Sequence, residues 1–184
     1  MSRKLIACIV CLCVPFAALA QVAIPAPAAP ASLEEKDWGV SPTSRPKGSP
    51  FHAPTPTTIP GGRVIKTMEL HGLLNANSEV LVVDVLDGKD RSTVPGAHWL
   101  PGGGNAPFYA AEKSRFTTAL DALTGGNKAR PLVFLCFNAE CWLSYNASLY
   151  AMEAGYKDVL WYRGGTSAWS GASLPLKKPR AVTW

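Results

Sequence analysis

The sequence lacks an apolar run long enough to stay across a bilayer, a block of like charge, and histidines spaced like metal ligands. A membrane-spanning helix needs about 20 apolar residues, and the longest apolar stretch, residues 5–16, is shorter. Basic residues form no stripe of the kind that binds nucleic acid. No further ligands at metal-binding spacing surround His52, His71 or His98. We therefore expect no membrane span, no nucleic-acid partner, no cofactor and no metal.

The N-terminus carries the pattern of an export signal. A positive start and a short apolar core are followed by the small residues Ala18-Leu19-Ala20, a typical cleavage site. This pattern predicts a signal peptide over residues 1–20, a mature chain that begins at Gln21, and a periplasmic location. The formal net charge then falls from +5 to +3 because Arg3 and Lys4 are lost.

Cysteine is scarce in the predicted mature chain. Of the five cysteines only Cys136 and Cys141 lie beyond residue 20. An exported protein meets an oxidising compartment, in which thiols usually pair or carry out redox chemistry. A disulfide between residues so close in sequence would constrain the unfolded chain little. We therefore expect a disulfide here to be functional rather than structural.

Proline divides the mature chain into two parts. Residues 21–60 carry nine of the sixteen prolines, with alanine, serine and threonine between them, which predicts a flexible, extended segment. Trp38 and Phe51 could pack on the folded part. Residues 61–184 are enough for one compact domain.

Strand and helix signals alternate through this domain and predict an α/β fold with a five-stranded, mostly parallel sheet and helices on both faces. We expect Thr67 to cap the first helix and the third strand to lie at an edge. The expected strands are Arg63–Lys66, Glu79–Val85, Pro95–Leu100 with its opening turn, Leu132–Leu135 and Asp158–Tyr162. The expected helices are Thr67–Asn75, Pro107–Leu123 and Leu143–Ala154.

Cys136 follows the apolar run Leu132–Leu135, which reads as a central strand, and precedes the third expected helix. Ligands of parallel sheets bind beyond the carboxyl ends of the strands. Free amides in the first turn of that helix would favour an anionic thiolate or persulfide at Cys136. The alternative is a buried, inert cysteine that closes a core strand.

The order of motifs resembles a rhodanese-like domain from Gly61 to Pro175. The resemblance rests on seven features in the family's order: Asp84 at a strand end, Pro95-Gly96-Ala97, the loop from Cys136 to Cys141, Ala154-Gly155-Tyr156, the strand Val159–Tyr162, Gly164-Gly165 and Trp169.

A closer resemblance is to the exported rhodanese-like proteins associated with PQQ-dependent catabolism and named for a Cys-x-x-Cys-Trp motif. It implies a link to a periplasmic PQQ-dependent dehydrogenase system. This chain departs from the motif, because four residues rather than two separate its cysteines. The matching segments are Pro56–Gly61, Pro95–Pro101, Leu123–Gly126 and Cys141–Ala147.

The family resemblance implies roles for the residues of the loop. Cys136 would carry sulfane sulfur as a persulfide cradled by loop amides. Cys141 is either a resolving thiol or a small residue that starts the helix. Trp142 is expected to pack under the loop. The remaining loop residues are Phe137, Asn138, Ala139 and Glu140, and the supporting residues are Asp84 and Arg163.

Charge in the loop argues against efficient use of anionic donors. The loop has no cation, and Glu140 would repel thiosulfate. Leu86 stands where the family often has an arginine, and Arg163 either approaches the mouth or lies on the surface. Trp142 occupies the position of the arginine in a Cys-x5-Arg phosphatase loop, which disfavours phosphate esters.

These observations predict sulfur transfer between a persulfide on Cys136 and a small sulfur compound or a protein thiol. Two alternatives remain open. The first is a thiol–disulfide redox protein that uses both cysteines, and the second is a non-catalytic binding module on the same fold.

Overall fold

The computed structural model describes residues 33–76 and 78–184. The predicted signal peptide, its cleavage site and residues 21–32 of the expected flexible segment lie outside the described residues. Within the described part, no helix is both long and apolar enough to cross a bilayer.

In the described residues, six strands form one sheet in which every neighbouring pair is parallel. The order across the sheet is β1-β5-β4-β2-β3-β6. The central strands β2, β4 and β5 are buried along their whole length, as their apolar sequences require in a sheet covered on both sides. The strands are β1 Arg63–Val64, β2 Leu81–Asp84, β3 His98–Trp99, β4 Leu132–Leu135, β5 Val159–Tyr162 and β6 Arg180–Ala181.

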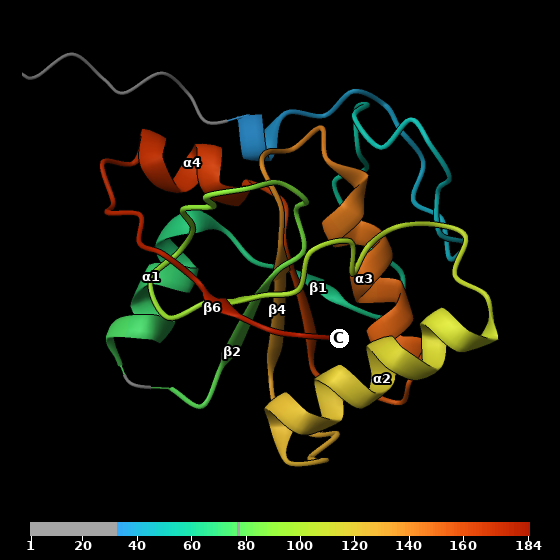
Figure 1. The fold of residues 1–184 in the computed structure, drawn as a ribbon. Helices are drawn as coiled ribbons and strands as arrows, with labels where there is room; N and C mark the ends of the chain where they lie inside the picture. Colours follow the sequence, from blue (N-terminus) through green and yellow to red (C-terminus); the bar gives the residue numbers. More distant parts are fainter. Residues whose placement is uncertain (1–32, 77) are drawn as a thin grey trace, which may run out of the picture.

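Helices cover both faces of the sheet, with α1 and α4 on one side and α2 and α3 on the other (Figure 1). Because side chains alternate along a strand, Phe134 of β4 joins the core with α2 and α3, whereas Val133 and Leu135 join the core with α1 and α4. The helices are α1 Thr67–Asn75, α2 Ala110–Thr124, α3 Trp142–Glu153 and α4 Gly165–Gly171, with a 3-10 turn η1 at Leu33–Glu35.

The predicted α/β class and the helices on both faces are confirmed, but the sheet has six strands rather than five. The strand expected at the edge, β3, lies between β2 and β6. Arg180 N–H donates to the Ala97 carbonyl at 3.0 Å, and Val182 N–H donates to the Trp99 carbonyl at 3.0 Å. A two-residue strand has no periodicity, so the sequence pattern gave no sign of β6.

The start of α1 also differs from the prediction. Lys66 is the N-cap and Thr67 is the first helical residue. The Thr67 hydroxyl bonds to the Glu34 carboxylate and to the Tyr162 hydroxyl, at 2.7 Å in each case. The Thr67 side chain therefore makes tertiary hydrogen bonds instead of capping the helix.

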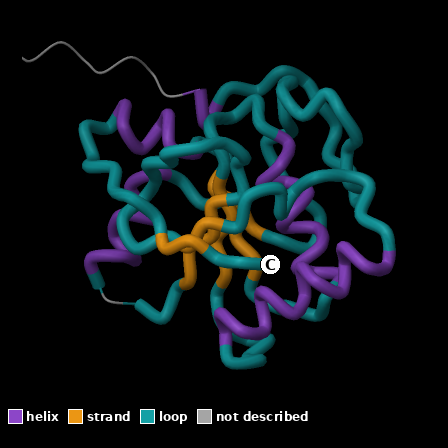
Figure 2. The backbone as a smooth tube through the Cα atoms, viewed as in Figure 1, coloured by secondary structure: helices purple, strands orange, loops and turns teal. Residues whose placement is uncertain are grey.

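Residues 33–60, here called the strap, were expected to belong to a flexible segment but lie against the domain. After η1, Figure 2 shows residues 36–60 as a loop path that leads toward β1. Thr43 N–H donates to the Tyr145 hydroxyl at 2.9 Å, and Lys47 exchanges two hydrogen bonds with the Asn146 amide at 2.8 and 2.9 Å. The proline-rich backbone thus finds partners on α3 instead of water. Phe51 packs against the core, as expected.

Candidate functional site

Cys136 directly follows β4 at the carboxyl edge of the sheet, and the six-residue loop 136–141 leads into α3. This is where the sequence places it. Only 1% of its surface is exposed, so Cys136 is enclosed by the segments that surround the loop.

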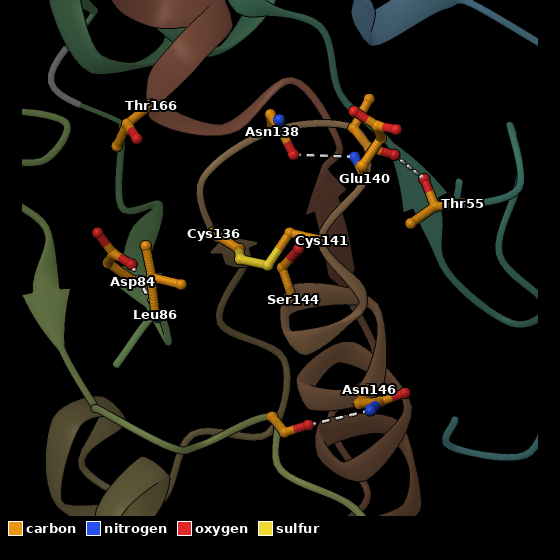
Figure 3. Close-up of a disulfide and its surroundings, with 12 residues drawn as sticks. Thr55, Asp84, Leu86, Cys136, Asn138, Glu140, Cys141, Ser144, Asn146 and Thr166 are labelled. Atoms are coloured by element: carbon orange, nitrogen blue, oxygen red, sulfur yellow. Dashed lines mark hydrogen bonds between the residues drawn. A yellow bond between two sulfur atoms is a disulfide. The ribbon is translucent and has the colours of Figure 1, made fainter. Parts of the chain in front are cut away.

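Cys136 and Cys141 form a disulfide across this loop, as Figure 3 shows. Their Cα atoms are 6.2 Å apart, within the range that a disulfide bridges. The four-residue spacing therefore brings the two sulfurs together, although it is longer than the spacing in the Cys-x-x-Cys-Trp motif. Cys141 is also the N-cap residue of α3.

Hydrogen bonds inside the loop fix its curvature. Glu140 N–H donates to the Asn138 side-chain oxygen at 3.0 Å, and Cys141 N–H donates to the Asn138 carbonyl at 3.1 Å. Asn138 therefore shapes the turn that returns the chain to Cys136. Within the described residues, the backbone N–H groups of Phe137, Asn138 and Ala139 have no protein acceptor.

The strap holds the second half of the loop from outside. Ala53 N–H donates to the Glu140 carbonyl at 2.8 Å, and Trp142 N–H donates to the Phe51 carbonyl at 2.9 Å. Free amides were expected in the first turn of this helix, but α3 begins one residue earlier than predicted, and the amide of its first residue, Trp142, bonds to the strap. Among the described residues, the loop amides of Phe137, Asn138 and Ala139 remain available as donors.

Trp142, which was expected to pack under the loop, is 4% exposed and packs among residues of α3 and the strap. Its ring is buried beside Tyr145 and Ile59, and its indole N–H donates to the Pro54 carbonyl at 3.1 Å. This bond ties the strap to the residue that begins α3.

The Gly164-Gly165 pair brings α4 against the first half of the loop. Thr166 N–H donates to the Cys136 carbonyl at 3.1 Å, and Ser167 N–H donates to the Phe137 carbonyl at 2.8 Å. Gly165 has a φ of +59°, and a Cβ there would lie 2.6 Å from the Phe137 carbonyl. Glycine at this position therefore permits the close approach on which both hydrogen bonds depend.

Asp84 lies beside Cys136 at the end of β2 and is fully buried. Its carboxylate accepts from Leu86 N–H at 3.0 Å and pairs with the Arg91 guanidinium at 2.8 Å. Burial raises the pKa of Asp84, and Arg91 opposes that rise. Arg91 also approaches Thr166 Oγ1 at 3.3 Å and the Cys136 carbonyl at 3.5 Å.

Arg91 corrects the expectation that Leu86 removes the arginine partner from this site. The cation comes five residues further along the same loop and bonds to the strand-end aspartate. An arginine within ten residues of Asp84 was the available signal, but sequence spacing alone could not show that the loop folds back.

Arg163 neither approaches an open mouth nor lies on the surface, because it is 1% exposed. Its guanidinium donates to carbonyl oxygens of Leu33, Glu34 and Lys36, and to Thr55, all in the strap. Trp38 lies over the same guanidinium at 5.0 Å, so this tryptophan packs on the domain as expected. Arg163 is thus the buried anchor of the strap.

The other loop side chains differ in exposure. Ala139 is buried, whereas Phe137 is 49% exposed. Figure 3 shows the Glu140 side chain pointing away from the disulfide, so its repulsion of an anion at the sulfur is weaker than the sequence implies. In residues 33–76 and 78–184, no three His, Cys, Asp or Glu side chains are grouped as metal ligands.

A family model, the rhodanese-like domain, matches residues 67–172. No curated protein matches the chain in sequence. Among solved structures, a thiosulfate sulfurtransferase from Pseudomonas aeruginosa superposes with a TM-score of 0.51 and 21% identity, over 67% of this chain and 22% of that protein. The chain therefore spans about a fifth of that enzyme. A protein from Lactobacillus plantarum superposes with a TM-score of 0.50 and 20% identity, over 62% of this chain and 87% of that one. Both likenesses concern the fold.

Proposed function

Because the chain belongs to the rhodanese-like domain family, we propose that it transfers sulfane sulfur through a persulfide on Cys136, with Cys141 as the resolving thiol. The observation that carries this proposal is the position of Cys136. It begins the loop at the carboxyl end of a central strand, and the second cysteine of that loop is within bonding reach.

The first step is nucleophilic attack by the Cys136 thiolate on the sulfane sulfur of a donor. With thiosulfate, the sulfur–sulfur bond of the donor breaks, sulfite leaves, and a persulfide anion remains on Cys136. The loop amides of Phe137, Asn138 and Ala139 are the donors available to stabilise this anion.

The persulfide then has two routes. An external acceptor can take the terminal sulfur, which restores the Cys136 thiolate. Alternatively, the Cys141 thiol attacks the Cys136 sulfur, the two cysteines form their disulfide, and the terminal sulfur leaves with the thiol proton as hydrosulfide. A dithiol, either small or part of a protein, must then supply two electrons and two protons to reduce the disulfide.

Thiocyanate release tests the proposal. Reduced protein is loaded with thiosulfate or inorganic polysulfide, freed of excess donor, and treated with cyanide. We expect a stoichiometric amount of thiocyanate from the Cys141→Ser variant, which cannot resolve its persulfide, and a smaller amount from the wild type, which releases part of the sulfur as hydrosulfide. A protein that binds no sulfane sulfur from either donor would contradict the proposal.

The disulfide also supports a second candidate, thiol–disulfide exchange with a protein partner without sulfur transfer. In that case the reduced protein would reduce a disulfide substrate, form the Cys136–Cys141 bond and yield no thiocyanate after exposure to either donor. The same assay thus distinguishes the two functions.

We further propose that the protein acts in the periplasm, in support of a PQQ-dependent dehydrogenase system. The export signal supports the location, and the resemblance to the exported Cys-x-x-Cys-Trp proteins supports the link. Amino-terminal sequencing of exported protein should give Gln21 as the first residue. An uncleaved or lipidated amino terminus would contradict the proposed processing.

Charge near the sulfur should modulate the use of thiosulfate. Replacing Glu140 with arginine is expected to raise the rate of loading from thiosulfate by about fivefold or less, because the side chain is partly exposed and turned away from the disulfide. The loading rate is measured as the rate at which sulfite is released. Glu140→Gln removes the negative charge without adding a cation, so its loading rate should lie between those of the wild type and Glu140→Arg. Loading rates equal to that of the wild type in both variants would show that Glu140 does not influence the use of thiosulfate.

A further inference from the structure

A strap residue far from the cysteines in sequence lies in direct contact with their loop. Thr55 is completely buried, and its hydroxyl donates to the Ala139 carbonyl at 2.5 Å, across 84 residues of sequence. Figure 3 shows this bond on the side of the loop opposite Asp84. Ala139 lies between Cys136 and Cys141, so the bond acts on the segment that joins the two sulfurs.

Arg163 fixes the direction of that hydroxyl. Its Nε donates to Thr55 Oγ1 at 3.1 Å, and its Nη2 donates to the Thr55 carbonyl at 3.1 Å. An arginine side chain can only donate, so Thr55 Oγ1 accepts from it and directs its single proton to Ala139. The buried positive charge also polarises the hydroxyl and strengthens this bond.

The peptide unit between Ala139 and Glu140 is consequently held at both ends. Its carbonyl accepts from Thr55, and its N–H donates to the Asn138 side chain. Rotation of this peptide would move the loop amides and change how Cys141 faces Cys136. Held in place, it keeps the donor set and the second thiol in a defined geometry.

We propose that Thr55, oriented by Arg163, is a positioning residue for the sulfur chemistry of Cys136 and Cys141. This inference rests on the proposed function for its choice of reaction, but the geometry that carries it is independent of the donor. The strap then completes the active site in addition to covering it. Thr55 touches no reacting atom and acts through the peptide unit of the loop.

The test compares three variants of the full-length mature protein. Thr55→Val keeps the shape and removes the hydroxyl, and Thr55→Ser restores the hydroxyl. Thr124→Val is the matched control, because the Thr124 hydroxyl is also buried and bonds to the Leu120 carbonyl and the Tyr156 hydroxyl, away from the cysteines.

Two quantities are measured for each variant, the rate of sulfur loading from polysulfide and the pH dependence of Cys136 alkylation in the reduced protein. We expect Thr55→Val to load about tenfold more slowly and to need a higher pH for alkylation. Thr55→Ser should restore both quantities. Thr124→Val should lower the melting temperature without changing either.

Thr55→Val with the loading rate and alkylation profile of the wild type would overturn the inference, as would an equal effect of Thr124→Val. If the wild type loads no sulfur, the sulfur-transfer function is refuted. If, in that case, the pH dependence of Cys136 alkylation still shifts only in Thr55→Val, the positioning role is supported. An unshifted profile in that case would refute both.

Discussion

Replacement of Cys136 by serine is expected to abolish sulfur loading, with a loss of at least about a thousandfold in thiocyanate release. A serine hydroxyl is not ionised near neutral pH and cannot form a persulfide, whereas a thiolate at the start of this loop can. The measurement is thiocyanate production with polysulfide as donor, because polysulfide reduces the influence of donor charge on the comparison.

Cys141→Ser is the matched control for that loss, because it removes the other sulfur of the same loop. This variant should still accept sulfur on Cys136, but it should release little hydrosulfide and keep its persulfide longer than the wild type. Loading by Cys136→Ser at a rate near that of the wild type would disprove the assignment of the nucleophile. Prompt hydrosulfide release by Cys141→Ser without an added thiol would disprove the resolving role.

Replacing Arg91 with methionine is expected to destabilise the protein by about 3–5 kcal/mol at neutral pH. The substitution leaves the buried Asp84 carboxylate without its ion-pair partner, while the methionine retains much of the packing. Chemical denaturation measures the change. The double variant Asp84→Asn with Arg91→Met should recover most of the loss, because it removes the uncompensated charge.

The loss in Arg91→Met should depend on pH with a defined sign. Burial already raises the pKa of Asp84 above its ordinary value of 3.8, and removal of Arg91 raises it further. The folded variant therefore binds a proton more tightly than the unfolded chain, so its stability falls as pH rises through the raised pKa. The difference from the wild type should shrink on acidification toward the ordinary range of the carboxyl. A difference that grows on acidification would contradict this account of Asp84.

The sequence was informative where the signal is local. The four apolar residues of β4 directly precede Cys136, and the order of strands, helices and turns identified the fold class and the loop. A cysteine that follows a central strand of a parallel sheet lies at the carboxyl edge of the sheet, where ligands bind. Because Asn138 and Trp142 follow Cys136 closely in sequence, their places in the loop and at its end were predicted with it. The turn-forming role of Asn138 was not foreseen.

The sequence failed where a role depends on contacts between distant segments. Arg163 resembled a surface residue because nothing near it in sequence shows that five hydrogen bonds from its guanidinium meet the strap. The prolines of residues 33–60 predicted a solvated segment, but composition does not show that Tyr145, Asn146 and Arg163 bond to its backbone. Thr55 carried no signal at all, since its partner lies 84 residues away.

The most direct test of a persulfide on Cys136 that Cys141 resolves is the intact mass of reduced wild-type protein over a single exposure to polysulfide. The account predicts that the protein first gains the mass of one sulfur atom, and that this sulfur maps to Cys136. The protein should then lose this sulfur as hydrosulfide and finish two hydrogens lighter than the reduced form, with a disulfide between Cys136 and Cys141. A protein that gains no sulfur, or whose two thiols both remain free and alkylatable at the end, would contradict it.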